Sequence, residues 1–273
     1  MKSAESSGEA ARVDALQGAD HRSLRVRIGK NGHMADELAV AMTLAFYPRG
    51  GSAQVVRYLG RALQRLGTDV TVCSGSLGPP GVASHAATFF DGLQVYALDF
   101  TESVAWFGDG RDPMAAPVPI HPSFEDRPGV PDRVFASIDS EAYERQVAAW
   151  LALLKEVGAP DIYHVHHLTH VNDAIRALDP RPVVSHLHGT ELKMLHDIRH
   201  SESGGWPHAE EWDRRLVAAA HRADRVIVIS PADRQLAVDL LGLDPGPVSY
   251  THLRAHETNE SISYAVFCLK MGG

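Results

Sequence analysis

Small and polar residues follow the first long apolar run of this 273-residue chain, at a point where a helix begins. Gly50, Gly51 and Ser52 come after the run at 38–45. Glycine lets backbone approach a ligand closely, and free N–H groups at a helix start could bind an anion such as a diphosphate. An ordinary strand-to-helix turn has the same composition, with Ser52 as its N-cap residue. The G-x-G-x-x-G and Walker patterns are both absent here.

Histidine is abundant, with sixteen residues in the chain, and four of them fall in one short segment. The segment with His164, His166, His167 and His170 superficially resembles the H-x-H-x-D-H ligand pattern of metal-dependent hydrolases, but His167 stands outside its spacing. The aspartate of that pattern is missing, and the sequence offers no obvious second ligand cluster. We therefore expect no metal site. A metal-dependent hydrolase that uses the 164–170 cluster stays open as an alternative.

A second group of polar residues follows the apolar run at 183–187. His186 and His188 are two residues apart, and Thr190 and Glu191 come directly after them. A neutral imidazole at the end of a strand could exchange a hydrogen bond with a sugar hydroxyl or a phosphate oxygen. A histidine bonded to a neighbouring carbonyl is the structural alternative. His188 lies nearest the loop and is the stronger candidate.

Alternating apolar runs and helical periodicities position these residues. The sequence predicts strands at 38–45, 69–73, 93–98, 162–165, 183–187 and 226–229. It predicts helices at 53–66, 141–157, 170–178, 210–222 and 231–241, several of them closed by glycine. Strands that alternate with helices indicate an α/β fold, a Rossmann-like doubly wound parallel sheet. In such a sheet, ligands bind at the carboxyl ends of the strands.

Two segments interrupt or precede this alternation. Residues 1–37 are polar and without sustained periodicity, and we interpret them as a disordered leader or an over-extended gene start. Residues 101–139 are rich in Pro, Gly, Asp and His and show no clear period, which is typical of a functional or mobile excursion. The predicted domain therefore spans 38–247.

Residues 248–273 read differently from the rest of the chain. VSYTHLRAHET at 248–258 and ISYAVFCL at 262–269 match the conceptual translation of a sequencing adapter in one frame. The three residues between the two blocks occupy the place of a sample index. We therefore predict a non-native tail, excluded from fold reasoning, with the natural reading frame continuing beyond it. A genuine strand at 262–269 is the alternative.

Bulk composition excludes several classes of protein. A net charge of −8 without a basic stripe argues against nucleic-acid binding. The chain has two cysteines, Cys73 and Cys268, so we expect no disulfide framework and a cytoplasmic location. No apolar run is long enough to span a membrane.

Four segments together resemble the N-terminal part of family 4 glycosyltransferases of the GT-B fold. They are FYPRGGSAQVVRYLGRAL at 46–63, DIYHVHH at 161–167, VSHLHGTE at 184–191 and ADRVIVIS at 223–230. The order and spacing of these segments fit the family from about 38 to 247. The resemblance implies two Rossmann-like domains that face each other across a cleft, of which this chain would be the acceptor-side domain.

The resemblance also implies roles for residues and ligands. Gly50, Gly51 and Ser52 would contact the donor diphosphate, and His188 would be catalytic, in contact with the transferred sugar or the acceptor. The acceptor side would include His166, Thr190 and Glu191, and the loop at 121–129 is a further candidate by position. The co-substrate would be a nucleotide-sugar, with no cofactor and no metal.

The reaction implied by the resemblance is retaining transfer of a sugar to an acceptor hydroxyl, of the hexosyltransferase type. The acceptor would be a small molecule, a glycan or a lipid-linked molecule, the last with peripheral membrane contact. The donor-binding C-terminal domain of the family has no counterpart here, so we expect the fragment to be inactive alone. A non-catalytic sugar- or nucleotide-binding domain is a further alternative.

Overall fold

A computed structural model describes residues 38–178, 181–200 and 205–250. The predicted leader at 1–37 lies outside the described residues, as does the adapter-like tail from 251 onward. Both interpretations therefore stay predictions. Within the described part, no helix is both long and apolar enough to cross a membrane.

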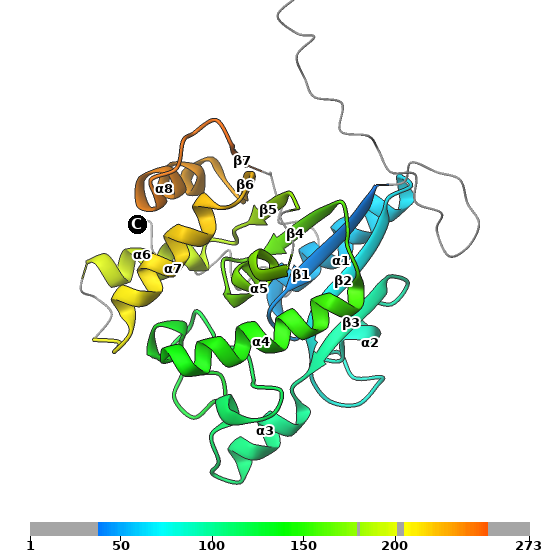
Figure 1. Cartoon of the computed structure of the whole chain (residues 1–273), viewed down its shortest axis with the longest axis vertical. Coiled ribbons are helices and arrows are strands. Elements are labelled where there is room, and N and C mark those ends of the chain that lie inside the picture. Colours follow the sequence, from blue (N-terminus) through cyan, green and yellow to red (C-terminus); the bar gives the residue numbers. More distant parts are fainter. Residues whose placement is uncertain (1–37, 179–180, 201–204, 251–273) are drawn as a thin grey trace, which may run out of the picture. The chain divides into compact units, whose positions relative to one another are not determined.

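The described chain forms a seven-stranded sheet in the order β3-β2-β1-β4-β5-β6-β7, and every neighbouring pair is parallel (Figure 1). The strands are β1 Ala39–Leu44, β2 Asp69–Ser76, β3 Gln94–Asp99, β4 Ile162–His166, β5 Val183–His186, β6 Arg225–Val228 and β7 Val248–Tyr250. The six predicted strands are confirmed. β7 was not expected, because its three residues fall in the predicted tail.

Eight α-helices and two short 3₁₀ helices connect the strands of the described chain. The α-helices are α1 Gly50–Arg65, α2 Ala86–Phe89, α3 Thr101–Gly108, α4 Ser140–Val157, α5 His170–Leu178, α6 Thr190–Arg199, α7 Ala209–His221 and α8 Pro231–Leu241. The 3₁₀ helices are η3 Pro113–Ala115 and η4 Phe135–Ser137. The sequence predicted α1, α4, α5, α7 and α8. It missed α2, α3 and α6, which are short or lie in segments rich in charge, Pro and Gly.

Local capping explains where the predicted helices begin and end. The Asp139 side chain accepts the N–H of Ala142 at 2.8 Å and starts α4, which ends at Gly158 with φ 86°. Ser230 caps α8 in the same way, with Pro231 in its first turn. These caps satisfy N–H groups that the helix itself leaves free.

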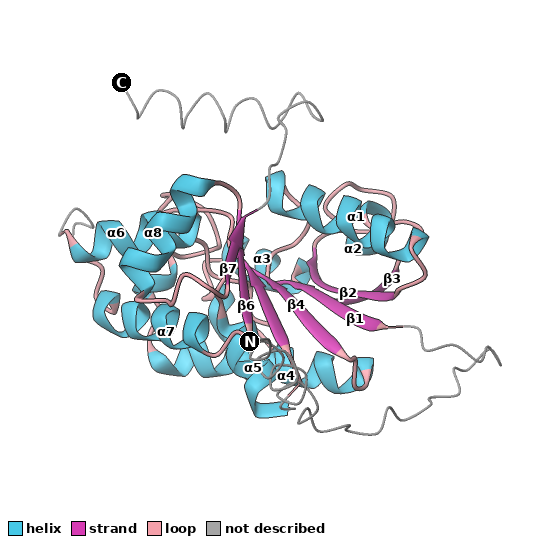
Figure 2. Ribbon diagram, turned by 90° about the horizontal axis from the view of Figure 1, so that it is seen from above, coloured by secondary structure: helices cyan, strands magenta, loops and turns pink. Residues whose placement is uncertain are grey.

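The core lies on both faces of the sheet, and side chains alternate between the faces along each strand. On β1, Met42 and Leu44 join a cluster with Val56 of α1, whereas Ala41 joins a second cluster with Trp150 of α4. Figure 2 shows α1 and α2 on one side of the sheet and α4 and α5 on the other. The predicted doubly wound, Rossmann-like parallel sheet is therefore confirmed.

The order of the strands reverses between β1 and β4. The chain builds outward from β1 to β3 and then returns to add β4 on the opposite side of β1. Loops after β1 and β4 consequently diverge, and ligands of doubly wound sheets generally bind beside such a reversal. The residues that follow β1, β4 and β5 are the ones in which the sequence predicted chemistry.

Candidate functional site

Gly50, Gly51 and Ser52 form the first turn of α1 rather than a loop before it. The expectation that Ser52 caps this helix is wrong, since the N-cap residue is Arg49, whose side chain makes no capping bond. Gly50 has φ +66°, a conformation that favours glycine, and a Cβ added at Gly50 or Gly51 would meet nothing within 4 Å. The first turn therefore presents exposed backbone N–H groups, with no acidic side chain among them. Such a turn suits an anion.

The Arg49 side chain links the segment at 101–139 to this turn. Its Nη2 donates to Oδ2 of Asp132 at 2.6 Å, and its Nη1 donates to the Tyr47 hydroxyl at 2.9 Å. Arg127 donates to the same Asp132 oxygen at 2.7 Å. Asp132 is only 3% exposed, so one buried carboxylate holds two guanidinium groups. No sequence pattern indicated this contact, because Arg49 and Asp132 are 83 residues apart.

The loop at 121–129 packs against the ends of β1 and β4. The His121 ring is fully buried and meets Phe46 edge-on, with the ring centroids 4.9 Å apart. Phe124 lies 5.6 Å from the ring of His167. Burial and the positive charge of Arg49 lower the pKa of His121 to about 3, so this imidazole is neutral. The loop is thus beside the candidate site, and its role in acceptor binding stays a prediction.

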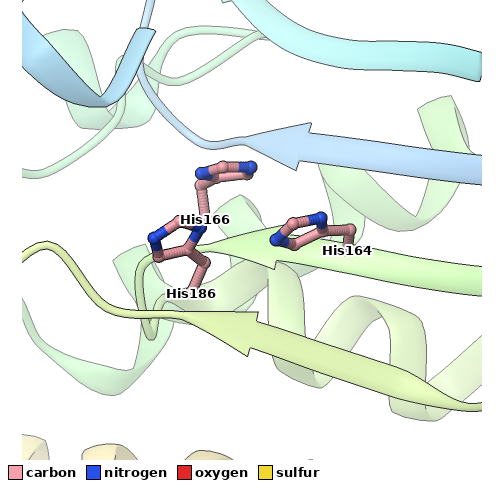
Figure 3. A group of neighbouring side chains, drawn as sticks. All are labelled: His164, His166 and His186. Carbon is pink, nitrogen blue, oxygen red and sulfur yellow. The ribbon is translucent and has the colours of Figure 1, made fainter. Parts of the chain in front are cut away.

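Four histidines form a buried stack at the ends of β4 and β5, which we call the histidine cluster: His164, His166, His186 and His188. Strand alternation puts His164 and His166 on one face, and the parallel register pairs His166 with His186. Ring centroids are 4.6 Å apart for His164 and His166 and 5.1 Å apart for His166 and His186. Figure 3 shows three of these side chains together beside the neighbouring strands. His166 Nδ1 lies 3.0 Å from His188 Nε2.

The histidine cluster is electrically neutral. Loss of solvent lowers the pKa of His164 to about 4 and, with help from neighbouring histidines, that of His186 to about 3. The same causes hold the pKa values of His166 and His188 well below 6.5. A second proton on any ring would be both desolvated and close to other rings. At neutral pH each imidazole therefore keeps a lone pair.

Glu191 connects this cluster to the start of α6. Its Oε2 accepts the His188 N–H at 3.2 Å and the Thr190 hydroxyl at 3.3 Å. Its Oε1 lies 2.6 Å from Nδ1 of His167, and both side chains are at most 5% exposed. His167 has φ +69°, and it is the only non-glycine residue in the described chain with a positive φ. Backbone strain of this kind concentrates at functional sites.

The predicted site residues fall into two groups. In the first turn of α1, after β1, Gly50 and Gly51 are exposed and Ser52 is half-buried. His166 ends β4, His188 and Glu191 follow β5, and all three are buried. Thr190 is half-buried beside them. The sequence did not single out Arg49 or Asp132. It named His167 only within the 164–170 segment, and its contact with Glu191 was not predicted.

The histidine segment at 164–170 does not form a single ligand group. His170 begins α5 and packs near Phe135 and Trp150, with ring centroids 6.1 and 6.2 Å away. Among the described residues, the nitrogens close enough to share a metal belong to His164, His166 and His186. The structure therefore does not bring together the ligands of the hydrolase alternative. Strand pairing places His186 beside His164 and His166, whereas His170 begins α5 and lies apart from them.

The family model described as Glycosyltransferase Family 4 matches residues 49–252 of this chain. No curated protein matches it. Among solved structures, sucrose-phosphate synthase from Thermosynechococcus elongatus is 15% identical with a TM-score of 0.48, covering 78% of this chain and 47% of that one. Apo UGT2 from Phytolacca americana is 14% identical with a TM-score of 0.46, covering 83% and 54%. A glycosyltransferase from Rickettsia africae is 8% identical with a TM-score of 0.42, covering 88% and 51%. The chain spans about half the length of these structures.

Proposed function

Because the chain belongs to glycosyltransferase family 4, we propose that it supplies the acceptor side of an enzyme that transfers a sugar from a nucleotide-sugar. The observation that carries this proposal is the position of the first turn of α1 and of His188. They follow β1 and β5, at the same edge of one parallel sheet. Ligands of such sheets bind at this edge, beside the point where the strand order reverses.

The first turn of α1 is the proposed contact for the donor diphosphate. Gly50 and Gly51 offer N–H donors without a Cβ in the way, Ser52 adds a third N–H, and no acidic side chain stands in this turn. In the transfer, the bond between the anomeric carbon and the phosphate oxygen breaks, and negative charge grows on the leaving diphosphate. Fixed donors aimed at that charge stabilise the transition state more than the ground state.

His188 is proposed to contact the transferred sugar. Its Nε2 is bonded to His166, so Nδ1 is the nitrogen that would face a sugar hydroxyl. The acceptor oxygen bonds to the anomeric carbon from the side that the diphosphate leaves, and the acceptor proton passes to the departing phosphate oxygen. The configuration is thereby retained. His188 orients the sugar as a neutral imidazole and carries no net charge through the step.

Thr190 is the proposed contact for the acceptor, since its hydroxyl is half-buried at the start of α6. His166 and Glu191 are buried, and each is bonded to His188. We therefore assign these two a positioning role: His166 holds the imidazole of His188, and Glu191 holds its backbone N–H. The resemblance implied acceptor binding by all three residues, and the present proposal keeps that role for Thr190 alone.

Amide NMR titration of the 273-residue chain with UDP, GDP and ADP tests the proposed donor contact. We expect shifts at Gly50, Gly51 and Ser52, and a loss of affinity of at least about fivefold in Gly51→Asp, which places a negative charge among the donors. Gly108→Asp is the matched control, because it adds the same charge at another open glycine. Equal weakening in both variants, or no shift at the first turn of α1, would contradict the proposal.

A transfer assay tests the proposal that this chain needs the other half of the enzyme. We expect no product from the chain with a panel of nucleotide-sugars and simple acceptors, because the donor would be held on one side only. Product at a rate typical of whole enzymes, on the order of 1 s⁻¹ or more, would show that the chain is sufficient. Tritium or mass labelling of the sugar makes the assay sensitive to single turnovers.

A further inference from the structure

Three imidazoles of the histidine cluster offer nitrogens that all lie within 4.8 Å of one another. They belong to His164 and His166 of β4 and to His186 of β5. Figure 3 shows them gathered beside the neighbouring ends of these two strands. We propose that His164, His166 and His186 bind a divalent transition-metal ion, with Zn²⁺ the best match, at the carboxyl ends of β4 and β5.

Buried nitrogens without partners support this assignment. His164 Nε2, His166 Nε2 and both ring nitrogens of His186 have no hydrogen-bond partner among the described residues. His166 is fully buried and His186 is 2% exposed. Buried polar atoms in folded proteins are nearly always satisfied, and exceptions call for a specific cause. A metal ion between the rings would satisfy one nitrogen of each.

Strand pairing gives the three rings a fixed base. His166 and His186 stand opposite each other in the parallel register, and His164 lies two residues before His166 on the same face. Zinc binds imidazole nitrogen at about 2.0–2.1 Å, which places neighbouring ligand atoms roughly 3.4 Å apart in a tetrahedron. Ion binding would require rotation of the imidazoles from the present limit of 4.8 Å to that spacing.

The chemistry of the donor set selects the kind of ion. Neutral imidazole favours zinc, copper, nickel and cobalt, whereas magnesium and calcium prefer oxygen ligands. His166 also bonds to His188 through Nδ1, and a second bond of this kind holds a metal-binding ring in place.

The proposed ion has a structural role. It would tie β4 to β5 and, through the bond from His166, fix the orientation of His188. This differs from the sequence expectation of no metal, and it does not use the 164–170 segment as a whole. The site does not depend on the proposed glycosyl transfer, so zinc binding and diphosphate binding can succeed or fail separately.

The first experiment titrates the EDTA-treated 273-residue chain with ZnCl₂ and, separately, with CoCl₂ and MgCl₂. We expect one Zn²⁺ per chain by isothermal calorimetry, cobalt absorption bands of a tetrahedral centre, and no response to magnesium. X-ray absorption at the zinc edge should count three imidazole ligands. Absence of saturable zinc binding, or a spectrum without imidazole scattering, would overturn the proposal.

Variants locate the site. His186→Leu removes a ligand whose ring nitrogens have no other partner, so the metal-free protein should keep its fold. Zinc affinity should fall by more than about 100-fold, beyond the loss expected from an outer-shell change. His164→Leu should do the same and serves if His186→Leu does not fold. Wild-type zinc affinity in a folded variant of either kind would contradict the assignment.

The matched control is the exposed pair at the end of α6. His196 is half-buried and His200 is exposed, and their rings stack with centroids 4.0 Å apart. The double variant His196→Gln with His200→Gln should bind one zinc with unchanged affinity. Loss of binding there, with retention in His186→Leu, would move the site to the surface and reject the buried one.

Discussion

The first turn of α1 and the histidine cluster occupy neighbouring strand ends and work by opposite means. The turn offers exposed backbone N–H groups, and an added Cβ at Gly50 or Gly51 would touch nothing. The cluster is made of buried side chains whose rings stack at 4.6 to 5.6 Å. The first turn of α1 depends on the absence of side chains, whereas the histidine cluster depends on the close packing of side chains.

This difference determines how each region responds to substitution. A helix N-terminus keeps its dipole and its free N–H donors when a nearby side chain is replaced. A substitution there should therefore change ligand affinity more than it changes the stability of the protein. Buried polar groups depend on one another, because removal of one partner leaves the rest desolvated and unpaired. Four predictions sharpen this contrast, and they run from the largest expected effect to the smallest.

The largest effect is expected at Glu191. Glu191→Ala removes the oxygens that serve His188, Thr190 and His167 and should lower the free energy of unfolding by about 3 kcal/mol. Urea unfolding measures the change. Glu141→Ala is the control, since Glu141 also stands in the first turn of a helix but is 85% exposed in its pair with Arg145. That variant should change stability by less than about 0.5 kcal/mol. Similar losses of unfolding free energy in both variants would contradict the contrast between the buried and the exposed carboxylate.

The next effect is a pH dependence that originates from His170. Burial holds its pKa at about 3, whereas the unfolded residue titrates near 6.5. Between these values the unfolded state binds a proton that the folded state does not, so stability falls as the pH falls below 6.5. His170→Leu should abolish about 2 kcal/mol of the loss between pH 8 and pH 5. Denaturant unfolding at both pH values gives the comparison. If the variant loses as much stability between pH 8 and pH 5 as the wild type, His170 would have to be protonated in the folded state.

A smaller effect is expected at Asp132, which joins the excursion to the N-cap residue of α1. Asp132→Asn keeps the shape but removes the charge that holds Arg49 and Arg127, for a loss of about 1.5 kcal/mol. Both guanidinium groups are about one third exposed, so solvent recovers part of the cost. Glu125→Gln, whose carboxylate is 58% exposed, is the control and should be neutral. Hydrogen exchange of the 121–129 amides should rise only in the Asp132 variant.

The smallest effects have opposite signs at two neighbouring glycines. Gly50→Ala places a side chain at φ +66° and should destabilise the protein by about 1 kcal/mol. Gly51→Ala has an ordinary helical backbone and open space, so it should stabilise by about 0.5 kcal/mol. Thermal unfolding of the two variants side by side measures the difference. A loss of thermal stability in both variants would show that the first turn of α1 is packed against other atoms rather than open.

Much of the fold could be predicted because its signals are local. The apolar run before Gly50, the Ser230 cap and the closing glycines each act within a few residues, and they gave the six strands and the long helices. Helix α6 was missed because it lies in a charged segment after Gly189, and the contact of Glu191 with His167 is one that the local sequence does not reveal. Strand β7 was missed because its residues were interpreted as part of the tail.

For the site, the sequence by itself determined which residue types follow which strand: glycines after β1, histidines after β4 and β5. The parallel order then required them to share one edge. Only the tertiary structure decided which side chains meet, since the register pairs His166 with His186, whereas His170 begins α5 and packs near Trp150. The physical reason is range. Caps and helix dipoles act over one turn, whereas a cluster such as His164, His166 and His186 exists only once two strands are paired.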